Sequence, residues 1–113
     1  MMIANLTKNT ILAQQVRVAD SFFSRLRGLL GSAGLPAGEA LVIRPCNSVH
    51  TFGMRYPIDV IFADAQHRVV KTVAGMGPGR VAFCRAGRYT VELPSGTLAQ
   101  DGTAAGDQLA LNE

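Results

Sequence analysis

The chain has 113 residues and a mass of 12.0 kDa, with 48% hydrophobic residues, 17% charged residues and a formal net charge of +3. This length is typical of one domain, and the low charged fraction excludes disorder over most of the chain. The two cysteines are too few for a disulfide-stabilised scaffold. We therefore expect a single domain over residues 1–113 with its core at about 10–111.

The positive charge is concentrated in the first half of the chain. Residues 1–58 carry six basic and two acidic groups, whereas residues 59–113 carry five basic and six acidic groups. The basic residues are mostly arginines and are scattered, while dedicated nucleic-acid-binding proteins usually show a dense basic stripe. Because a guanidinium group suits bidentate contacts with carboxylates and phosphates, this pattern predicts a few specific anion contacts and no specific nucleic-acid partner.

No segment approaches the roughly 20 consecutive apolar residues that span a bilayer. Residues 1–10 also lack the basic and apolar regions of a secretory signal peptide. We therefore expect a cytoplasmic protein without a membrane partner, in which Cys46 and Cys84 are reduced.

The first predicted elements are a strand and a helix. Residues 11–18 are rich in β-branched residues and end at Asp20 and Ser21, which favours a strand. Either of those two residues is suited to cap a following helix over about residues 21–31, and Gly31 would end it. The apolar residues of that segment recur at helical spacing: Phe22, Phe23, Leu26, Leu29 and Leu30.

The remaining elements are predicted to be short strands. They cover residues 40–44, 58–63, 68–73, 89–93 and 108–111. The second and third are joined by a tight polar turn and so predict a hairpin. Turn signals every 8 to 12 residues or so are typical of small barrels and sandwiches. We therefore expect a mainly β (α+β) fold, an antiparallel-rich β-barrel-like domain with one N-terminal α-helix.

The segment from Pro45 to Asp59 holds the densest group of functional side chains and lies between two predicted strands. Loops on a β scaffold are common places for binding residues. The candidates within this loop are His50, Phe52, Met54, Arg55 and Asp59.

Asp59 stands in a strand that is otherwise apolar on both faces, so its carboxylate is expected to be at least partly buried and to need partners. Two arrangements satisfy this need. In one, Asp59 accepts backbone N–H groups or pairs with an arginine and thereby holds the loop in place. In the other, Asp59 orients Arg55 or His50 toward a ligand.

Two further chemistries involve the cysteines. Cys46, His50 and Cys84 lack the spacing of a standard zinc site, so we expect no metal. A Cys46 nucleophile with His50 as its base is a formal alternative, although a cysteine is more often a small buried hydrophobe.

A second cluster of basic residues lies between Gly77 and Arg88, on a segment with several glycines. The arginines of this segment are Arg80, Arg85 and Arg88. In one interpretation they are solvated side chains. In the other, the segment folds back over the His50–Asp59 loop, so that Arg55 and one or two of these arginines form an anion site.

Several motifs together resemble the domain of unknown function 192 family. They are Arg27-Gly28-Leu29-Leu30, His50-Thr51-Phe52-Gly53-Met54-Arg55, Pro57-Ile58-Asp59-Val60-Ile61-Phe62, Val91-Glu92-Leu93-Pro94-Ser95-Gly96 and Gly106-Asp107. The resemblance covers about residues 10–111 and implies a small β-barrel-like domain with one helix, without an established activity. The positions carried over are Gly28, Met54, Arg55, Pro57, Asp59, Glu92, Gly96 and Asp107.

Two of these motifs need a comment. Many members of that family have an aromatic residue before the methionine, where this chain has Gly53, which implies a wider pocket or one of different shape. Glu92 is a carboxylate within an apolar strand. If Tyr89, Val91 and Leu93 face the core, Glu92 faces outward or lines a cleft.

We expect a non-catalytic domain that binds a small polar or anionic ligand in a cleft formed by the His50–Asp59 loop, with no cofactor. The candidate ligand-binding residues are His50, Phe52, Met54, Arg55, Asp59, Arg80, Arg85 and Glu92. One alternative is an acid–base hydrolase or lyase that uses His50 with Asp59 or Glu92. The other is a protein-interaction module that binds through the predicted helix or the Arg80–Arg88 loop.

Overall fold

The computed structural model describes residues 1–21, 24–25, 28–29 and 32–112. The described strands are β1 (Met2–Asn5), β2 (Thr10–Ala13), β3 (Gln15–Ala19), β4 (Glu39–Ile43), β5 (Ser48–His50), β6 (Ile58–Ala63), β7 (Val69–Met76), β8 (Val81–Phe83), β9 (Tyr89–Pro94) and β10 (Leu109–Asn112). The described helix is α2 (Thr97–Asp101). The prediction of a mainly β fold is therefore confirmed.

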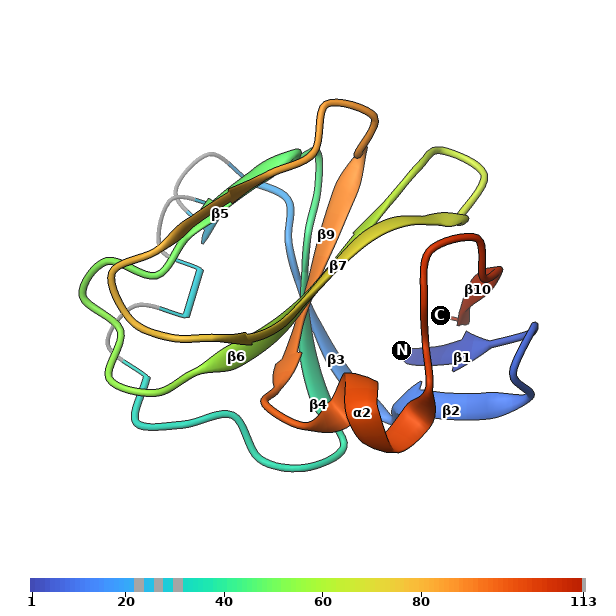
Figure 1. Cartoon of the computed structure of the whole chain (residues 1–113), viewed down its shortest axis with the longest axis horizontal. Helices are drawn as coiled ribbons and strands as arrows, with labels where there is room; N and C mark the ends of the chain where they lie inside the picture. The colour runs from blue at the N-terminus through green and yellow to red at the C-terminus, as the bar shows by residue number, and fades with distance from the viewer. Residues whose placement is uncertain (22–23, 26–27, 30–31, 113) are drawn as a thin grey trace.

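A five-stranded sheet with the order β3-β4-β9-β6-β7 forms the centre of the molecule (Figure 1). β3 and β4 run parallel, and the other neighbours run antiparallel. All six residues of β6 are buried, since this strand is covered on both faces. The described strand pairings leave β3 and β7 as the outer strands. The expected barrel-like closure is therefore replaced by an open central sheet.

The two faces of the central sheet belong to two hydrophobic clusters. Successive side chains of a strand point to opposite faces. Ile61 and Val91 accordingly lie in the first cluster, and Val60 and Phe62 lie in the second. Because both faces are buried, the central strands read as nearly continuous apolar runs rather than as alternating ones.

A different layer covers each face. The first cluster includes residues of α2 and of the three-stranded sheet β10-β1-β2, among them Ile3, Leu98 and Leu109. The second cluster includes Val49 of β5 and Ala82 of β8. Figure 1 shows β5 far from α2 and β2 along the long axis of the molecule. The two ends of the domain therefore carry different surface elements.

The helix expected over about residues 21–31 is not among the described elements. Its residues 22–23, 26–27 and 30–31 lie outside the described part of the chain. The described helix, α2, lies near the C-terminus instead, where no helix is expected from the sequence. It ends after five residues because Gly102 adopts a left-handed conformation with a φ of 82°.

The expected strand over residues 11–18 is divided at Gln14. The backbone N–H groups of Gln14 and Gln15 both donate to the carbonyl oxygen of Gly38, at 2.9 and 3.1 Å. At this point the chain leaves the three-stranded sheet and enters the central sheet. The predicted hairpin at residues 58–73 is confirmed, since β6 and β7 pair antiparallel. No described helix is long and apolar enough to cross a membrane.

Candidate functional site

Asp59 is 1% exposed and is bonded entirely to backbone groups. Its Oδ1 accepts the N–H of Gly75 at 2.8 Å. Its Oδ2 accepts the N–H of Gly96 at 3.1 Å and of Leu98 at 2.8 Å. The carboxylate therefore joins β6 to β7 and to the start of α2, whose N-cap residue Gly96 has no capping side chain of its own. This is the first of the two predicted arrangements, in which Asp59 holds the backbone in place.

Glu92 is a second buried carboxylate, on the opposite face of the central sheet. It lies between Leu41 and Val60 of the neighbouring strands and is 4% exposed. Its Oε1 is buried and has no hydrogen-bond partner within the described residues. Burial raises the pKa of Glu92 to about 7. Of the two predicted alternatives for Glu92, the outward orientation is wrong, because the face opposite Val91 is covered as well.

The two-stranded ribbon of β5 and β8 presents one buried and one exposed face. Val49 pairs with Ala82, and both are buried against the second cluster. On the exposed face, His50 pairs with Val81, which is 65% exposed. Phe83 on the same strand is 53% exposed. The ribbon therefore carries an exposed apolar surface beside the predicted His50.

The turn after β5 extends this surface. Phe52 is 54% exposed, and its ring centroid lies 5.5 Å from that of His50. Gly53 has a φ of 82°, a left-handed conformation that favours glycine. Met54 turns inward and is buried in the second cluster. Of these two apolar candidates, Phe52 is therefore exposed at this surface and Met54 is not.

Thr51 fixes the second basic segment to this turn. Its hydroxyl donates to the carbonyl of Gly77 at 2.6 Å and accepts the N–H of Arg80 at 2.9 Å. Its backbone N–H donates to the carbonyl of Arg80 at 2.8 Å, and its carbonyl accepts the N–H of Gly79 at 3.0 Å. Residues 77–80 thus fold back onto the His50–Asp59 loop. This is the arrangement on which the hypothesis of a shared anion site depends.

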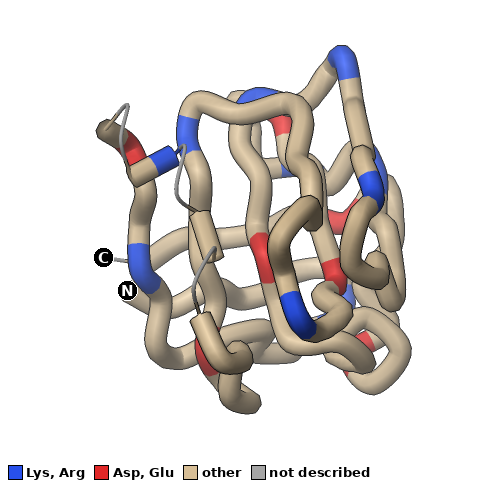
Figure 2. The backbone as a smooth tube through the Cα atoms, turned by 90° about the vertical axis from the view of Figure 1, so that its left-hand side faces the viewer, with Lys and Arg blue, Asp and Glu red and all other residues tan. Residues whose placement is uncertain are grey.

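The predicted arginines Arg55, Arg80 and Arg85 are all exposed. Within the described residues, none of their guanidinium groups has an ion-pair partner. Lys71 lies beside Phe83, because its Nζ donates to the carbonyl of Phe83 at 2.9 Å. Figure 2 shows the basic positions separated from one another along the chain, without a continuous stripe. The cations are therefore free to make individual contacts with an anion.

The cysteine and acid–base alternatives receive no support from the described contacts. The Sγ of Cys46 donates to the carbonyl of Ser48, while the Nδ1 of His50 accepts the N–H of Phe52. No described hydrogen bond joins His50 to Asp59 or Glu92, which are buried while His50 is exposed. Within the described residues, no three His, Cys, Asp or Glu side chains are grouped closely enough to hold a metal ion.

The sequence of this chain matches a known protein family. The sequence pattern of DUF192, described as an uncharacterised ACR, matches residues 3–111. The chain belongs to the DUF192 family. A UPF0127 protein of Pyrococcus horikoshii is 36% identical to it over 114 residues, covering 96% of this chain and 96% of the relative. A UPF0127 protein of Thermococcus sibiricus is 31% identical over 113 residues, covering 96% of this chain and 73% of the relative.

Two solved structures share the fold of this DUF192 chain. The crystal structure of a protein of unknown function from Novosphingobium aromaticivorans has a TM-score of 0.83 at 17% identity, covering 97% of this chain and 82% of that one. The crystal structure of a putative transcription regulator from Sinorhizobium meliloti has a TM-score of 0.83 at 16% identity, covering 96% and 89%. At these identities the likeness shows the fold alone.

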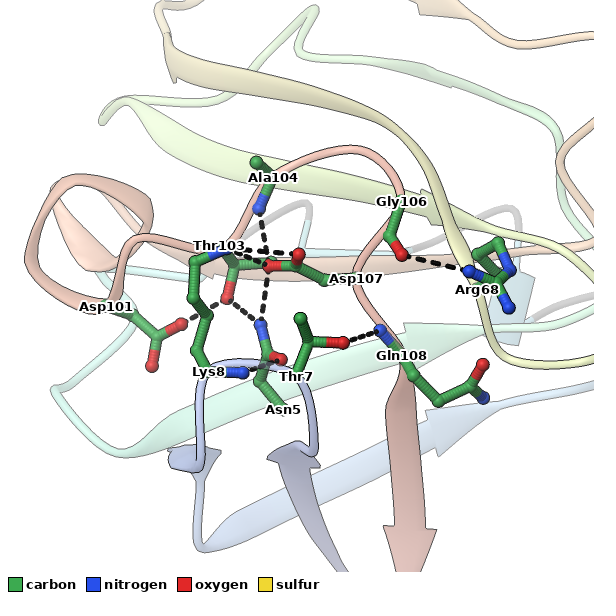
Figure 3. Close-up of polar contacts among 10 residues, drawn as sticks. All are labelled: Asn5, Thr7, Lys8, Arg68, Asp101, Thr103, Ala104, Gly106, Asp107 and Gln108. Atoms are coloured by element: carbon green, nitrogen blue, oxygen red, sulfur yellow. Dashed lines mark hydrogen bonds and ion pairs between the residues drawn. The ribbon is translucent and has the colours of Figure 1, made fainter.

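Asp107 is another residue of the DUF192 motifs. It belongs to a buried polar network that joins residues near the two ends of the chain (Figure 3). Its Oδ2 accepts the side-chain amide of Asn5 at 3.0 Å, the N–H of Ala104 at 3.0 Å and the Nζ of Lys8 at 3.0 Å. The amide of Asn5 also donates to the hydroxyl of Thr103 at 2.8 Å. These bonds connect the hairpin of β1 and β2 to the loop before β10. Asp107 therefore has a structural role in this DUF192 domain.

The sequence does not indicate that Val81 and Phe83 form part of this surface, or that the buried Thr51 supports it. Val81 and Phe83 lie in a strand of three residues, too short to give a periodic signal. Thr51 is a small polar residue whose importance comes from contacts with a segment 26 to 29 residues away. The sequence around Thr51 does not indicate a contact with such a distant segment.

Proposed function

We propose that this domain binds a small ligand that carries both an anionic group and an aromatic or other apolar part. The proposed site is the exposed face of the β5–β8 ribbon together with the turn at residues 51–55. The supporting observation is that exposed apolar side chains lie on connected segments of this surface together with arginines that have no ion-pair partner in the described part of the chain. The ligand contacts assigned here are His50, Phe52, Arg55, Arg80, Val81, Phe83 and Arg85.

The charge of this surface favours an anion. Residues 40–58 and 65–91 contain no Asp or Glu. A negatively charged group at the ribbon therefore meets arginines without a competing carboxylate from the same segments. Because guanidinium groups make paired hydrogen bonds with phosphates and carboxylates, one or two arginines suffice to orient such a group.

His50 adds a directed hydrogen bond. Its Nδ1 accepts the N–H of Phe52 at 3.3 Å, so the neutral ring carries its proton on Nε2. The Nε2–H is then available to donate to an anionic oxygen. The aromatic ring of Phe52, next to the His50 ring, offers a face on which the apolar part of the ligand packs.

The buried candidates take no part in this contact. Met54, Asp59 and Glu92 are 9%, 1% and 4% exposed, and Asp59 already accepts three backbone hydrogen bonds. In this proposal these three residues stabilise the fold beneath the binding surface. The ligand contacts come from exposed residues.

Titrations with phenyl phosphate and with inorganic phosphate, followed by amide chemical shifts, test the proposal. We expect both compounds to shift residues 50–55 and 80–85, and phenyl phosphate to bind more tightly because of its ring. Replacing Arg55 or Arg80 by alanine is expected to weaken binding about tenfold, the equivalent of roughly 1.4 kcal/mol. Phe52→Ser is expected to remove the preference for phenyl phosphate.

The matched control is Arg17→Ala, which removes an exposed arginine from β3, outside the proposed surface. It is expected to leave both titrations unchanged. Equal weakening by Arg17→Ala would mean that only general electrostatic attraction is measured, and would contradict the site. Absence of shifts at residues 50–55 at concentrations of roughly 10 mM would contradict it as well.

A further inference from the structure

A groove of about 530 Å³ lies between β2 and the turn from β9 into α2. It is lined by residues 10–14, 37–38, 94–97 and 100–101. Its volume falls in the range typical of ligand pockets, roughly 300 to 1,000 Å³. None of these described lining residues belongs to the β5–β8 ribbon or to the turn at residues 51–55, so this groove is separate from the proposed anion site.

One wall of the groove is the free edge of a strand. β2 is the outer strand of the sheet β10-β1-β2 and pairs with β1 on one side. Residues 10–14 line the groove consecutively, although successive side chains of a strand point in opposite directions. The main chain of β2 must therefore face the groove. An edge of this kind offers backbone donors and acceptors to an added strand.

The side chains of the groove indicate what kind of strand fits. Ile11 lines it and is 53% exposed, although it is a large apolar residue. Asp101, at the end of α2, is the only charged residue among the lining residues that the structure describes. The N–H groups of Gly96 and Leu98 are already bonded to Asp59, so neither is available to an anion. The groove therefore favours an apolar side chain next to a basic one.

The hydroxyl of Thr10 is a second indication of what kind of chain fits the groove. This hydroxyl is buried and has no hydrogen-bond partner within the described residues, and Thr10 lines the groove. Buried hydroxyl groups normally have a partner. The backbone of a chain lying along β2 carries both the N–H and the C=O groups that would provide one.

From these observations we infer that the groove binds an extended peptide segment, which adds a strand to the edge of β2. An apolar side chain of the peptide packs on Ile11, and a lysine or arginine faces Asp101. A second copy of this chain fits less well, because the edge of β2 lies between walls formed by other residues of the domain.

The test uses blocked pentapeptides of alternating valine and threonine, with one lysine placed in turn at each position. In titrations of the isotopically labelled protein, we expect at least one peptide to shift the amides of residues 10–14 and 94–101, with a Kd of roughly 0.1 to 1 mM. The same peptide with its backbone nitrogens methylated is expected not to bind, because it has lost the donors that pair with β2. Ile11→Lys is expected to weaken binding at least about tenfold by placing a charge on the edge.

Leu6→Lys is the matched control, since Leu6 is 60% exposed but does not line the groove. It is expected to leave peptide binding unchanged. Three results would overturn the inference: no shift at residues 10–14 with any of the peptides, undiminished binding of the methylated peptide, or equal losses in the two lysine variants. Binding of phenyl phosphate at the β5–β8 ribbon is measured separately and does not depend on this outcome.

Discussion

Glu92 is a buried carboxylic acid whose Oε1 has no hydrogen-bond partner within the described residues. Because burial raises its pKa in the folded protein from 4.5 to about 7, the folded state retains a proton that the unfolded chain releases. The contribution of Glu92 to the free energy of unfolding is therefore greatest below about pH 4.5. It decreases as the pH rises to about 7 and is constant above that.

We expect wild type to lose up to roughly 3 kcal/mol of stability through this group between pH 4.5 and pH 8. Glu92→Gln removes the titrating group and is expected to flatten that part of the pH dependence. Urea unfolding of both proteins across this range measures the difference. Glu39→Gln, a change of a half-buried glutamate on β4, serves as the control. An unchanged pH dependence in Glu92→Gln would show that Glu92 does not titrate in this range.

At the scale of elements, the polar network of Figure 3 joins the β1–β2 hairpin to the loop before β10. Asn5 is fully buried, and its amide donates to both Thr103 and Asp107. The hydrogen bond from Asn5 is the main cause that lowers the pKa of Asp107, with further contributions from Ala104 and Lys8. The stabilisation that this carboxylate provides is therefore present above its ordinary pKa of 3.8 and is lost as the pH falls through the lowered value.

Asn5→Ala is expected to cost about 2 to 3 kcal/mol, since it leaves buried polar partners unsatisfied. It is also expected to reduce the resistance to acid unfolding, because the pKa of Asp107 rises toward its ordinary value. Lys8→Ala removes a half-exposed partner of the same carboxylate and is expected to cost less than about 1 kcal/mol. Urea unfolding at neutral and at acid pH tests both. Equal losses in the two variants would argue against a network centred on Asn5.

The accuracy of the sequence prediction depended on the length and burial of each element. The strands at residues 40–44, 58–63 and 89–93 were predictable because each is a run of apolar residues bounded by turn signals. β5 and β8 have three residues each, and no periodicity can be recognised over that length. α2 was missed because five residues carry little helical periodicity and because its cap, Asp59, lies 39 residues earlier.

The residues of the proposed site were predictable only in part, for a related reason. His50, Phe52, Arg55, Arg80 and Arg85 were named from residue type, and all are exposed. Met54 and Glu92 were named in the same way but are buried. The distinction depends on the second layer that covers the central sheet, which is formed by segments distant in sequence. Alternation within one strand cannot show whether its second face is covered.

At the scale of the whole molecule, the proposed function assigns stability to a buried carboxylate and ligand binding to exposed arginines. Asp59 connects three elements beneath the surface through backbone hydrogen bonds. Arg55, four residues earlier, is exposed and has no ion-pair partner within the described residues. Stability and binding should therefore depend on different members of the same motif.

The most direct test measures urea unfolding and phenyl phosphate binding together for Asp59→Asn and Arg55→Ala. Asp59→Asn is expected to lose about 2 kcal/mol or more of stability, because one of its carboxylate oxygens is replaced by a donor that faces backbone N–H groups. Arg55→Ala is expected to keep its stability within about 0.5 kcal/mol and to lose binding about tenfold. A stable Asp59→Asn variant, or an Arg55→Ala variant that unfolds more easily but binds normally, would contradict this division of roles.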